Sequence, residues 1–271
     1  MKNIESMTPQ ELYVYNHKHY HRFVTLCRFV IFALFLIIWE GSARLNIIDS
    51  FFFSSPSGVI RCIATLSMEN ELLFHILVTL LETLLSFAIV TIGSFLLATL
   101  LWHSTYVSKI LDPYLVILNS LPKSALAPLF LVWLGSGMKT VITCGVFVAF
   151  FSSTISLYTG FLQTDQDKAI LIYTLGGTKK DVFRKIVVPS SIPLLVSLSK
   201  VNIGLSLVGV IIGEFICSRY GLGHLIIYGS QVFQLDMVIS SIMILCAIAF
   251  GLYKIVQSLE HHGKKKNPSL S

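Results

Sequence analysis

Long apolar runs separated by short polar segments are the main pattern of the chain. A helix needs about 17–25 mostly apolar residues to cross a bilayer. Runs that meet this requirement occupy residues 24–40, 72–102, 138–162, 194–213 and 236–257. A further apolar stretch, residues 112–135, contains Pro113, Pro122 and Pro128, so we expect a kinked or broken helix there. The pattern predicts an all-α polytopic membrane protein with about six transmembrane helices.

Composition supports this class. Of the 271 residues, 54% are hydrophobic and only 13% are charged, whereas soluble domains carry about 25% charged residues. The net charge of +6 could indicate a nucleic-acid partner. We exclude that interpretation because the cations lie in loops and tails between apolar runs, as orientation signals do. The five cysteines show no CxxC or metal-ligand spacing, so we predict neither a disulfide nor a metal site.

The polar segment at residues 164–193 interrupts the apolar second half of the chain. We expect a helix at residues 168–175, ended by Gly176-Gly177 because glycine adopts the left-handed cap conformation freely. A second helix at residues 179–187 would be stopped by Pro189 and Pro193. Since both flanking runs are apolar, the segment must lie in water on one side of the membrane. A helix–glycine–helix element in that position is typical of a docking surface.

The distribution of cations predicts the orientation. Cytoplasmic loops are enriched in lysine and arginine, and most cations lie in the head at residues 1–23, the loop at 164–193 and the basic tail at 258–271. Only Arg44, Arg61, Lys139 and Arg219 fall in loops on the other side. We therefore place both termini and the 164–193 loop in the cytoplasm, with a transmembrane domain at residues 24–257. The tail is expected to be disordered.

The remaining polar segments have simpler expectations. Residues 9–20 could form an amphipathic helix on the membrane surface, or a solvated tail. Ser54-Ser55-Pro56-Ser57 offers a cap followed by proline, so residues 58–68 should form a helix outside the membrane. Residues 103–111 are expected to be a short inner loop, and residues 214–235 an outer, re-entrant segment.

Several short motifs carry a resemblance to a known family. Gly176, followed by Ile186 and Pro189, resembles the cytoplasmic loop signature of ABC-importer permeases, although Ile170-Leu171-Ile172 stands where that family usually has Glu-Ala-Ala. Other family-like motifs are Trp39-Glu40, Leu111-Asp112-Pro113, Ala125-Leu126-Ala127-Pro128-Leu129, Val132-Trp133-Leu134-Gly135-Ser136-Gly137, Gly213-Glu214-Phe215 and Gly221-Leu222-Gly223. In order and spacing they resemble the permeases of nitrate, taurine, aliphatic-sulfonate and thiamine-precursor importers.

The resemblance implies a type I ABC-importer permease fold in the bacterial plasma (inner) membrane. It also implies a permease homodimer, two cytoplasmic ABC ATPase subunits and an extracytoplasmic substrate-binding protein. The chain has no G-x-x-x-x-G-K-[ST] phosphate loop. We therefore expect a non-enzymatic subunit without its own cofactor, with ATP and Mg²⁺ bound by the partner ATPase.

The loop residues are the candidates for coupling to that ATPase. Apolar side chains would supply the contact and basic ones the electrostatic register; alternatively, these residues pack against the permease's own inner face. The candidate coupling residues are Leu171, Tyr173, Leu175, Gly176, Gly177, Thr178, Lys179, Lys180, Arg184 and Pro189.

Polar residues within the spans are candidates for the translocation path, because burying charge in a membrane is costly. The charged candidates are Glu82, Lys123, Lys200 and Glu214, which could instead form structural pairs (Glu82 with Lys200, Glu214 with Lys123) or snorkel to the interface. The uncharged candidates are Asn119, Ser120, Ser124, Asn202 and Ser206, which could instead hydrogen-bond across helices.

The sequence thus predicts the permease subunit of an ATP-driven importer for a small polar or anionic solute such as a sulfonate, taurine or nitrate. A thiamine-precursor pyrimidine or a riboflavin-like nutrient is the alternative cargo. A stand-alone secondary transporter would be expected to show paired intramembrane carboxylates or inverted repeats, and neither is evident. The proline-broken span argues against a scaffold without transport, since irregular backbone at membrane depth usually lines a cavity.

Overall fold

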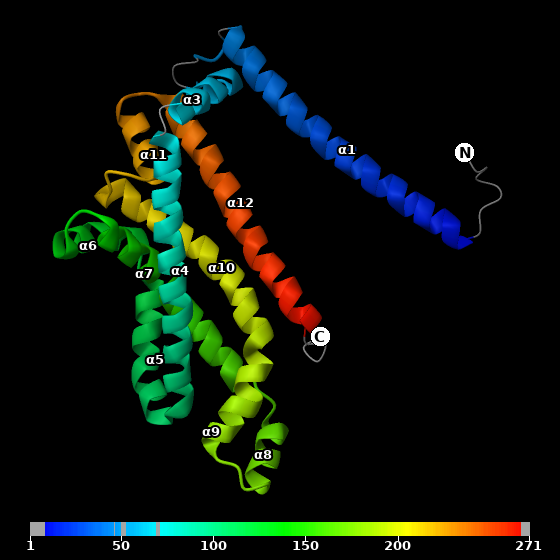
Figure 1. The fold of residues 1–271 in the computed structure, drawn as a ribbon, viewed down its shortest axis with the longest axis vertical. Helices are drawn as coiled ribbons and strands as arrows, with labels where there is room; N and C mark the ends of the chain where they lie inside the picture. Colours follow the sequence, from blue (N-terminus) through cyan, green and yellow to red (C-terminus); the bar gives the residue numbers. More distant parts are fainter. Residues whose placement is uncertain (1–8, 46, 50–52, 69–70, 267–271) are drawn as a thin grey trace.

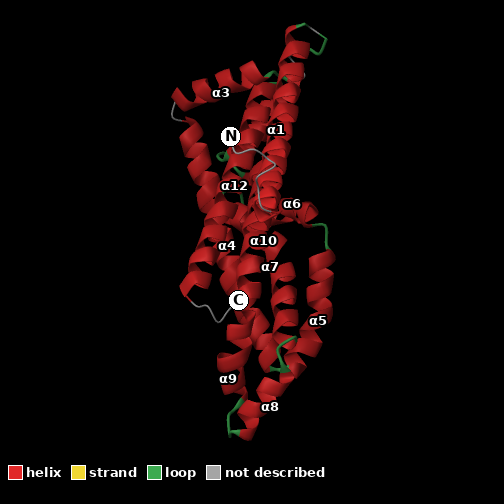
Figure 2. Ribbon diagram, turned by 90° about the vertical axis from the view of Figure 1, so that its right-hand side faces the viewer, coloured by secondary structure: helices red, strands yellow, loops and turns green. Residues whose placement is uncertain are grey.

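The computed structural model describes residues 9–45, 47–49, 53–68 and 71–266, and this part of the chain is helical almost throughout (Figures 1 and 2). Four of the helices are α1 (Pro9–Arg44), α3 (Pro56–Met68), α11 (Leu222–Gln231) and α12 (Leu235–Lys266). The others are α4 (Glu71–His103), α5 (Thr105–Ser120), η2 (Lys123–Leu126), α6 (Ala127–Leu134), α7 (Met138–Leu162), α8 (Gln166–Thr174), α9 (Lys179–Val182), η3 (Phe183–Val187) and α10 (Val188–Cys217).

The number of spans agrees with the sequence prediction. Five helices in the described residues are long and apolar enough to cross a membrane: Arg22–Arg44, Glu71–His103, Met138–Leu162, Lys179–Cys217 and Leu235–Ser258. A sixth candidate is the pair Thr105–Ser120 and Lys123–Leu134, which is bent by 91°. The bend falls at Leu121 and Pro122, because proline removes a backbone donor and disfavours the helical conformation of the residue before it.

The spans give the molecule two distinct ends (Figure 1). One end carries α8 and α9, and α4, α7 and α12 run toward it; we call it the loop end. The opposite end carries α3 and α11, and α10 runs toward it; we call it the outer end. The two ends follow from connections that are short compared with the helices, so consecutive spans alternate in direction.

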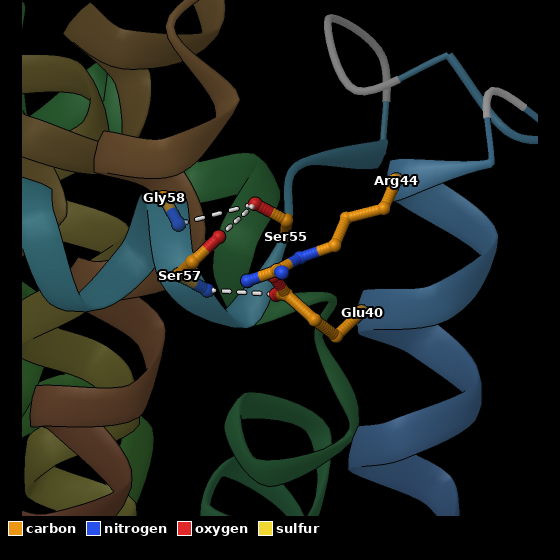
Figure 3. A network of polar contacts seen from close by, with 5 residues as sticks. All are labelled: Glu40, Arg44, Ser55, Ser57 and Gly58. Atoms are coloured by element: carbon orange, nitrogen blue, oxygen red, sulfur yellow. Dashed lines mark hydrogen bonds and ion pairs between the residues drawn. The ribbon is translucent and has the colours of Figure 1, made fainter.

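Helix α1 leans away from the other helices and meets them at the outer end (Figure 1). There the Glu40 carboxylate accepts hydrogen bonds from Arg44 Nε (2.7 Å) and from the Ser57 amide (3.1 Å). Ser55 Oγ accepts from the Gly58 amide at 3.1 Å, and Pro56 follows as the first residue of α3 (Figure 3). These acceptors satisfy amides in the first turn of α3, which have no partner within that helix. The predicted cap and the helix after it are thus confirmed.

The core of the bundle is the contact among α4, α7 and α10. A Cβ atom added at Gly209 of α10 would lie 2.7 Å from the carbonyl oxygen of Cys144 and from the Cα of Gly145, both on α7. One at Gly213 would lie 2.8 Å from the Cα of Val141. Glycine at these positions lets the two backbones approach closely, as small residues do in membrane helix pairs.

A chain of hydrogen bonds crosses the same contact. Asn202 Nδ2 on α10 donates to Ser153 Oγ on α7 at 2.8 Å, and Ser153 Oγ donates to Ser94 Oγ on α4 at 3.1 Å. All three residues are buried. The chain therefore links the three central helices through side chains that would be costly to bury without partners.

Several predicted boundaries are wrong. Residues 105–111 are not an inner loop but the first part of α5, which Ser104 caps by accepting from the Val107 amide at 3.3 Å. Residues 9–20 are not a separate surface helix, because α1 continues through them without a break. Residues 258–266 continue α12 and are not a disordered tail. Residues 1–8 and 267–271 lie outside the described residues.

The prolines after the 164–193 loop do not stop the helix. α9 passes through the π-helical turn η3 into α10, so Lys179 to Cys217 is one helical run. Pro189 lies in the first turn of α10, and Pro193 lies inside that helix. Pro189 directly follows the π-turn, which relaxes the hydrogen-bond pattern where its missing amide falls. Within a membrane helix, neighbouring groups can satisfy the carbonyl that Pro193 leaves free.

Replacing Gly209 with alanine should lower the stability of the bundle. The new methyl group would press on the backbone of α7, and overpacking of this kind costs about 1–3 kcal/mol. We expect a lower thermal unfolding temperature in detergent micelles, measured by intrinsic fluorescence. Gly204→Ala is the matched control, since a Cβ at Gly204 on the same helix meets nothing within 4 Å. Equal melting of the two variants would contradict the packing described here.

Candidate functional site

The loop between α7 and α10 is a rigid helix–turn–helix. Asp165 caps α8 by accepting from the Asp167 amide at 3.0 Å. Desolvation raises the pKa of the Asp165 carboxyl, but hydrogen bonds from Lys168 and the Asp167 amide outweigh it, so this pKa lies below its ordinary value. The turn after α8 is formed by Gly176, which has a φ of 81°, a conformation that glycine adopts without strain. The predicted glycine cap is therefore present.

A capping box starts α9. The Asp181 side chain accepts from the Thr178 amide at 2.9 Å, and Thr178 Oγ1 accepts from the Asp181 amide at 3.4 Å. The sequence prediction missed this feature, although Thr178 followed by Asp181 fits the known Ser/Thr-x-x-acid pattern. The box fixes the direction in which α9 leaves the turn.

Helix α8 has two faces. Ala169 and Ile172 pack against a buried apolar cluster of α4, α7, α9 and η3. Leu171 and Leu175, one turn apart, are 58% and 79% exposed, and Tyr173 is 49% exposed. Leu171 and Leu175 therefore do not pack against the rest of this chain, which was the alternative for them. An apolar face of this kind at the tip of a protrusion is suited to a protein partner.

Lys179 is held by its own chain. Its Nζ donates to the carbonyl oxygen of His103, the last residue of α4, at 2.8 Å, and lies 5.2 Å from the centre of the Trp102 ring. Trp102 also contacts Phe183, with ring centroids 5.0 Å apart. Lys179 therefore joins the start of α9 to the end of α4, and its predicted contact with a partner stays a prediction. Lys180 and Arg184 are exposed, and Pro189 is half-buried.

Two carboxyl groups meet near the outer end. Glu82 of α4 and Glu214 of α10 are each 1% exposed, and their carboxyl groups interact electrostatically. The sequence analysis did not find this pair. It suggested Lys200 as the partner of Glu82, but Lys200 precedes Glu214 by fourteen residues, or about 21 Å along a helix axis. Lys123, the other suggested partner, donates to Asn119 Oδ1 at 3.3 Å.

Hydrogen bonds hold Glu214 in place. Thr79 Oγ1 on α4 donates to Glu214 Oε1 at 2.6 Å and accepts from the Leu222 amide at 2.9 Å. The Gly223 amide donates to Glu214 Oε2 at 2.5 Å. A Cβ at Gly223 would lie 2.8 Å from that same oxygen. Glu214 thus ties the start of α11 to α4 and α10, and glycine is needed where the backbone approaches it.

The remaining polar path candidates lie in three places. Asn202 and Ser206 are buried between helices, and Asn202 takes part in the hydrogen-bond chain described above. Asn119 and Lys123 are half-buried and Ser120 and Ser124 are exposed, all at the bend between α5 and α6; Lys200 is half-buried on α10. The bend brings four of the predicted residues together, and their role in translocation stays a prediction.

Comparisons with known proteins decide the family. Residues 89–259 match the family described as the binding-protein-dependent transport system inner membrane component. The chain belongs to this family. It is 31% identical over 233 residues to a probable ABC transporter permease protein of Haemophilus influenzae, covering 86% of this chain and 94% of that protein.

Two further comparisons agree. The chain is 29% identical to the formylaminopyrimidine transport permease protein ThiX of Halalkalibacterium halodurans, over 71% of this chain and 76% of that protein. The inward-facing MetNI methionine ABC transporter has the same fold, with a TM-score of 0.58 at 16% identity over 71% of this chain and 97% of that one. The protein is a multi-pass permease subunit of the bacterial plasma membrane and is not catalytic; ATP hydrolysis belongs to a partner ATPase.

Thr79→Val should weaken the outer end of the permease. The substitution leaves Glu214 Oε1 and the Leu222 amide without the threonine hydroxyl, and each buried polar group so orphaned costs about 1–3 kcal/mol. Thermal unfolding of the purified permease should show a lower midpoint. Thr99→Val on the same helix is the control, because Thr99 Oγ1 bonds only to the Phe95 carbonyl of its own helix among the contacts found. A similar unfolding midpoint in both variants would contradict a stabilising role for the hydrogen bonds of Thr79 to Glu214 and Leu222.

Lys179→Met should loosen α9 from α4 while keeping the length of the side chain. The variant loses the bond to the His103 carbonyl and the contact with the Trp102 ring. Since Lys179 is exposed, we expect about a two- to fivefold faster amide hydrogen exchange in α9. Lys180→Met, on the exposed side of the same turn, should exchange like the parent protein. Mass spectrometry of the exchanged peptides checks this, and unchanged α9 exchange in Lys179→Met would exclude the link.

Proposed function

We propose that the loop end of this permease docks onto a cytoplasmic ABC ATPase, whose closure drives import of a small polar solute delivered by an extracytoplasmic binding protein. The observation that carries the proposal is the outer face of α8, where apolar side chains are exposed on a rigid, capped protrusion. Docking would bury them, and the exposed cations Lys180 and Arg184 beside them would set the register. Both termini lie in the cytoplasm in this scheme, because α1 and α12 each have one end at the outer end and extend away from it (Figure 1).

The contacts behind α8 suit it to transmit movement. Its inner face packs on a cluster that includes Ala98 of α4, Leu157 and Phe161 of α7, and Val187 of η3. Lys179 adds a direct link to the end of α4. A load on α8 would therefore displace three spans together, which is a rigid-body switch and not a local loop movement.

A second copy of the permease would complete the path. The backbone is broken at Leu121 and Pro122, and Ser120 and Ser124 are exposed beside the break. Irregular backbone at membrane depth is tolerated only where protein or water surrounds it. Pairing across the bend between α5 and α6 would shield these groups from lipid and line a passage with them. We therefore propose a homodimer.

The stand-alone secondary transporter considered from the sequence is not supported, because the chain belongs to the family of binding-protein-dependent transport components. Uptake through this permease should therefore stop when the partner ATPase cannot hydrolyse ATP.

Gly176→Trp should abolish uptake and capture of the ATPase while leaving membrane insertion intact. Tryptophan strains the positive-φ turn and places a bulky ring beside the docking face. Gly176→Asn is the matched control, since asparagine tolerates the left-handed conformation and should retain ATPase capture. Affinity purification from membranes, followed by immunodetection of the co-expressed ATPase, measures the outcome. Normal capture and uptake by the tryptophan variant would disprove docking at this turn.

A further inference from the structure

A cavity of about 670 Å³ lies near the outer end, between α4, the turn from α6 to α7 and the turn from α10 to α11. Glu82 lines it, together with Phe74, Arg219 and Tyr220. Residues of three separate elements thus line one open cavity, and one of these residues carries a buried carboxyl group.

The Glu82 carboxyl is incompletely satisfied. Its Oε2 atom has no hydrogen-bond partner, although the residue is only 1% exposed. The neighbouring Glu214 uses both of its oxygens, toward Thr79 and Gly223. A second buried carboxyl beside the first adds repulsion whenever both are charged. A proton or a cationic group in the cavity would relieve both the missing partner and the repulsion.

The other lining residues suit a cationic group. The Phe74 and Tyr220 rings stand edge to face with centroids 5.2 Å apart, and the faces of aromatic rings attract ammonium groups. Arg219 adds a positive charge to the same cavity. A sulfonate, carboxylate or ring acceptor of the same solute could pair with this guanidinium group. A simple anion such as nitrate would meet Arg219 but has no hydrogen-bond donor for Glu82 Oε2.

We propose that this cavity binds a small solute that carries an ammonium or amine group, with Glu82 accepting hydrogen bonds from that group and Arg219 facing its acceptor end. The proposal rests on the proposed function, because it takes the cavity to be a binding site for the imported solute on its way through the permease. It narrows the cargo to zwitterions and amine-bearing rings, such as taurine or an aminopyrimidine. It disfavours nitrate and sulfonates without an amine.

Two pairs of probes differ in the amine alone. Taurine and isethionate share a sulfonate, and 4-amino-5-hydroxymethyl-2-methylpyrimidine differs from its 4-hydroxy analogue at one position. We would titrate each into the purified permease–ATPase complex in lipid nanodiscs and follow thermal unfolding. The amine member of at least one pair should raise the midpoint by a few degrees in a saturable way. Its partner should not.

Variants of two α4 carboxyls locate the effect. Glu82→Gln should abolish the shift, whereas Glu71→Gln should retain it, because Glu71 lines a neighbouring cavity and not this one. A second measurement needs no variant: the amine probe should slow labelling of Glu82 by dicyclohexylcarbodiimide in the parent protein, read by mass spectrometry. Equal shifts within both pairs, a shift that survives in Glu82→Gln, or labelling unaffected by the probes would overturn the proposal.

Failure of this inference can be told from failure of the proposed function. Each preparation is also scored for the ATPase that co-purifies with the permease. If the ATPase is captured but the amine probes and their amine-free partners give the same shift, docking onto an ATPase is supported and the amine-binding site is wrong. If the parent permease captures no ATPase, the docking scheme itself falls.

Discussion

Close approach of α7 to α10 is the contact on which the rest of the structure depends. Lipid tails are as apolar as the helices, so burial of apolar surface does not drive helices together within a bilayer. Association must come from tight van der Waals contact and from polar groups that cross between helices. Gly209 and Gly213 supply the first, and the chain from Asn202 through Ser153 to Ser94 supplies the second. The loop end and the outer end are both built on this pair.

At the outer end, one buried carboxylate organises three elements. Glu214 accepts from the Thr79 hydroxyl and the Gly223 amide, so α10, α4 and α11 share a single acceptor. His75 belongs to the same hydrogen-bond network, because its Nδ1 accepts from the Gly221 amide at 2.9 Å. Such a buried network fixes geometry strictly, since every donor that loses its acceptor remains unsatisfied. The family-like motifs Gly213-Glu214-Phe215 and Gly221-Leu222-Gly223, which are separate in the sequence, therefore meet in this network.

Much of the fold followed from local patterns. Apolar length located α4 and α7 to within a residue or two, and Pro122 located the bend after α5. The errors arose where local signals compete with neighbouring structure. Pro189 and Pro193 resemble helix stops, yet Pro189 directly follows a π-turn and Pro193 is accommodated inside α10. The polar start of α5 resembled a loop because charge and hydroxyl groups masked a helix that Ser104 caps.

The sites were predicted unevenly for the same reason. The turn at Gly176 and the apolar residues around it depend on nearby sequence, so they could be placed in advance. The pairing of Glu82 with Glu214 depends on how α4 packs against α10, and nothing in the spacing of the two residues encodes it. Lys179 illustrates the same limit, because its contact with His103 joins residues 76 positions apart.

The unbroken helical run from α9 through α10 has a mechanical consequence. Its 39 residues correspond to about 58 Å at 1.5 Å per residue. Helix α7 packs against this run from Leu194 to Cys217, so the two helices would tilt together. A tilt of about 10° over that length would sweep one tip relative to the other by about 10 Å. Glu214 lies near the end of the run that is opposite to α9, so a small displacement at the loop end would reshape the cavity beside Glu82 without any chemical signal passing between them.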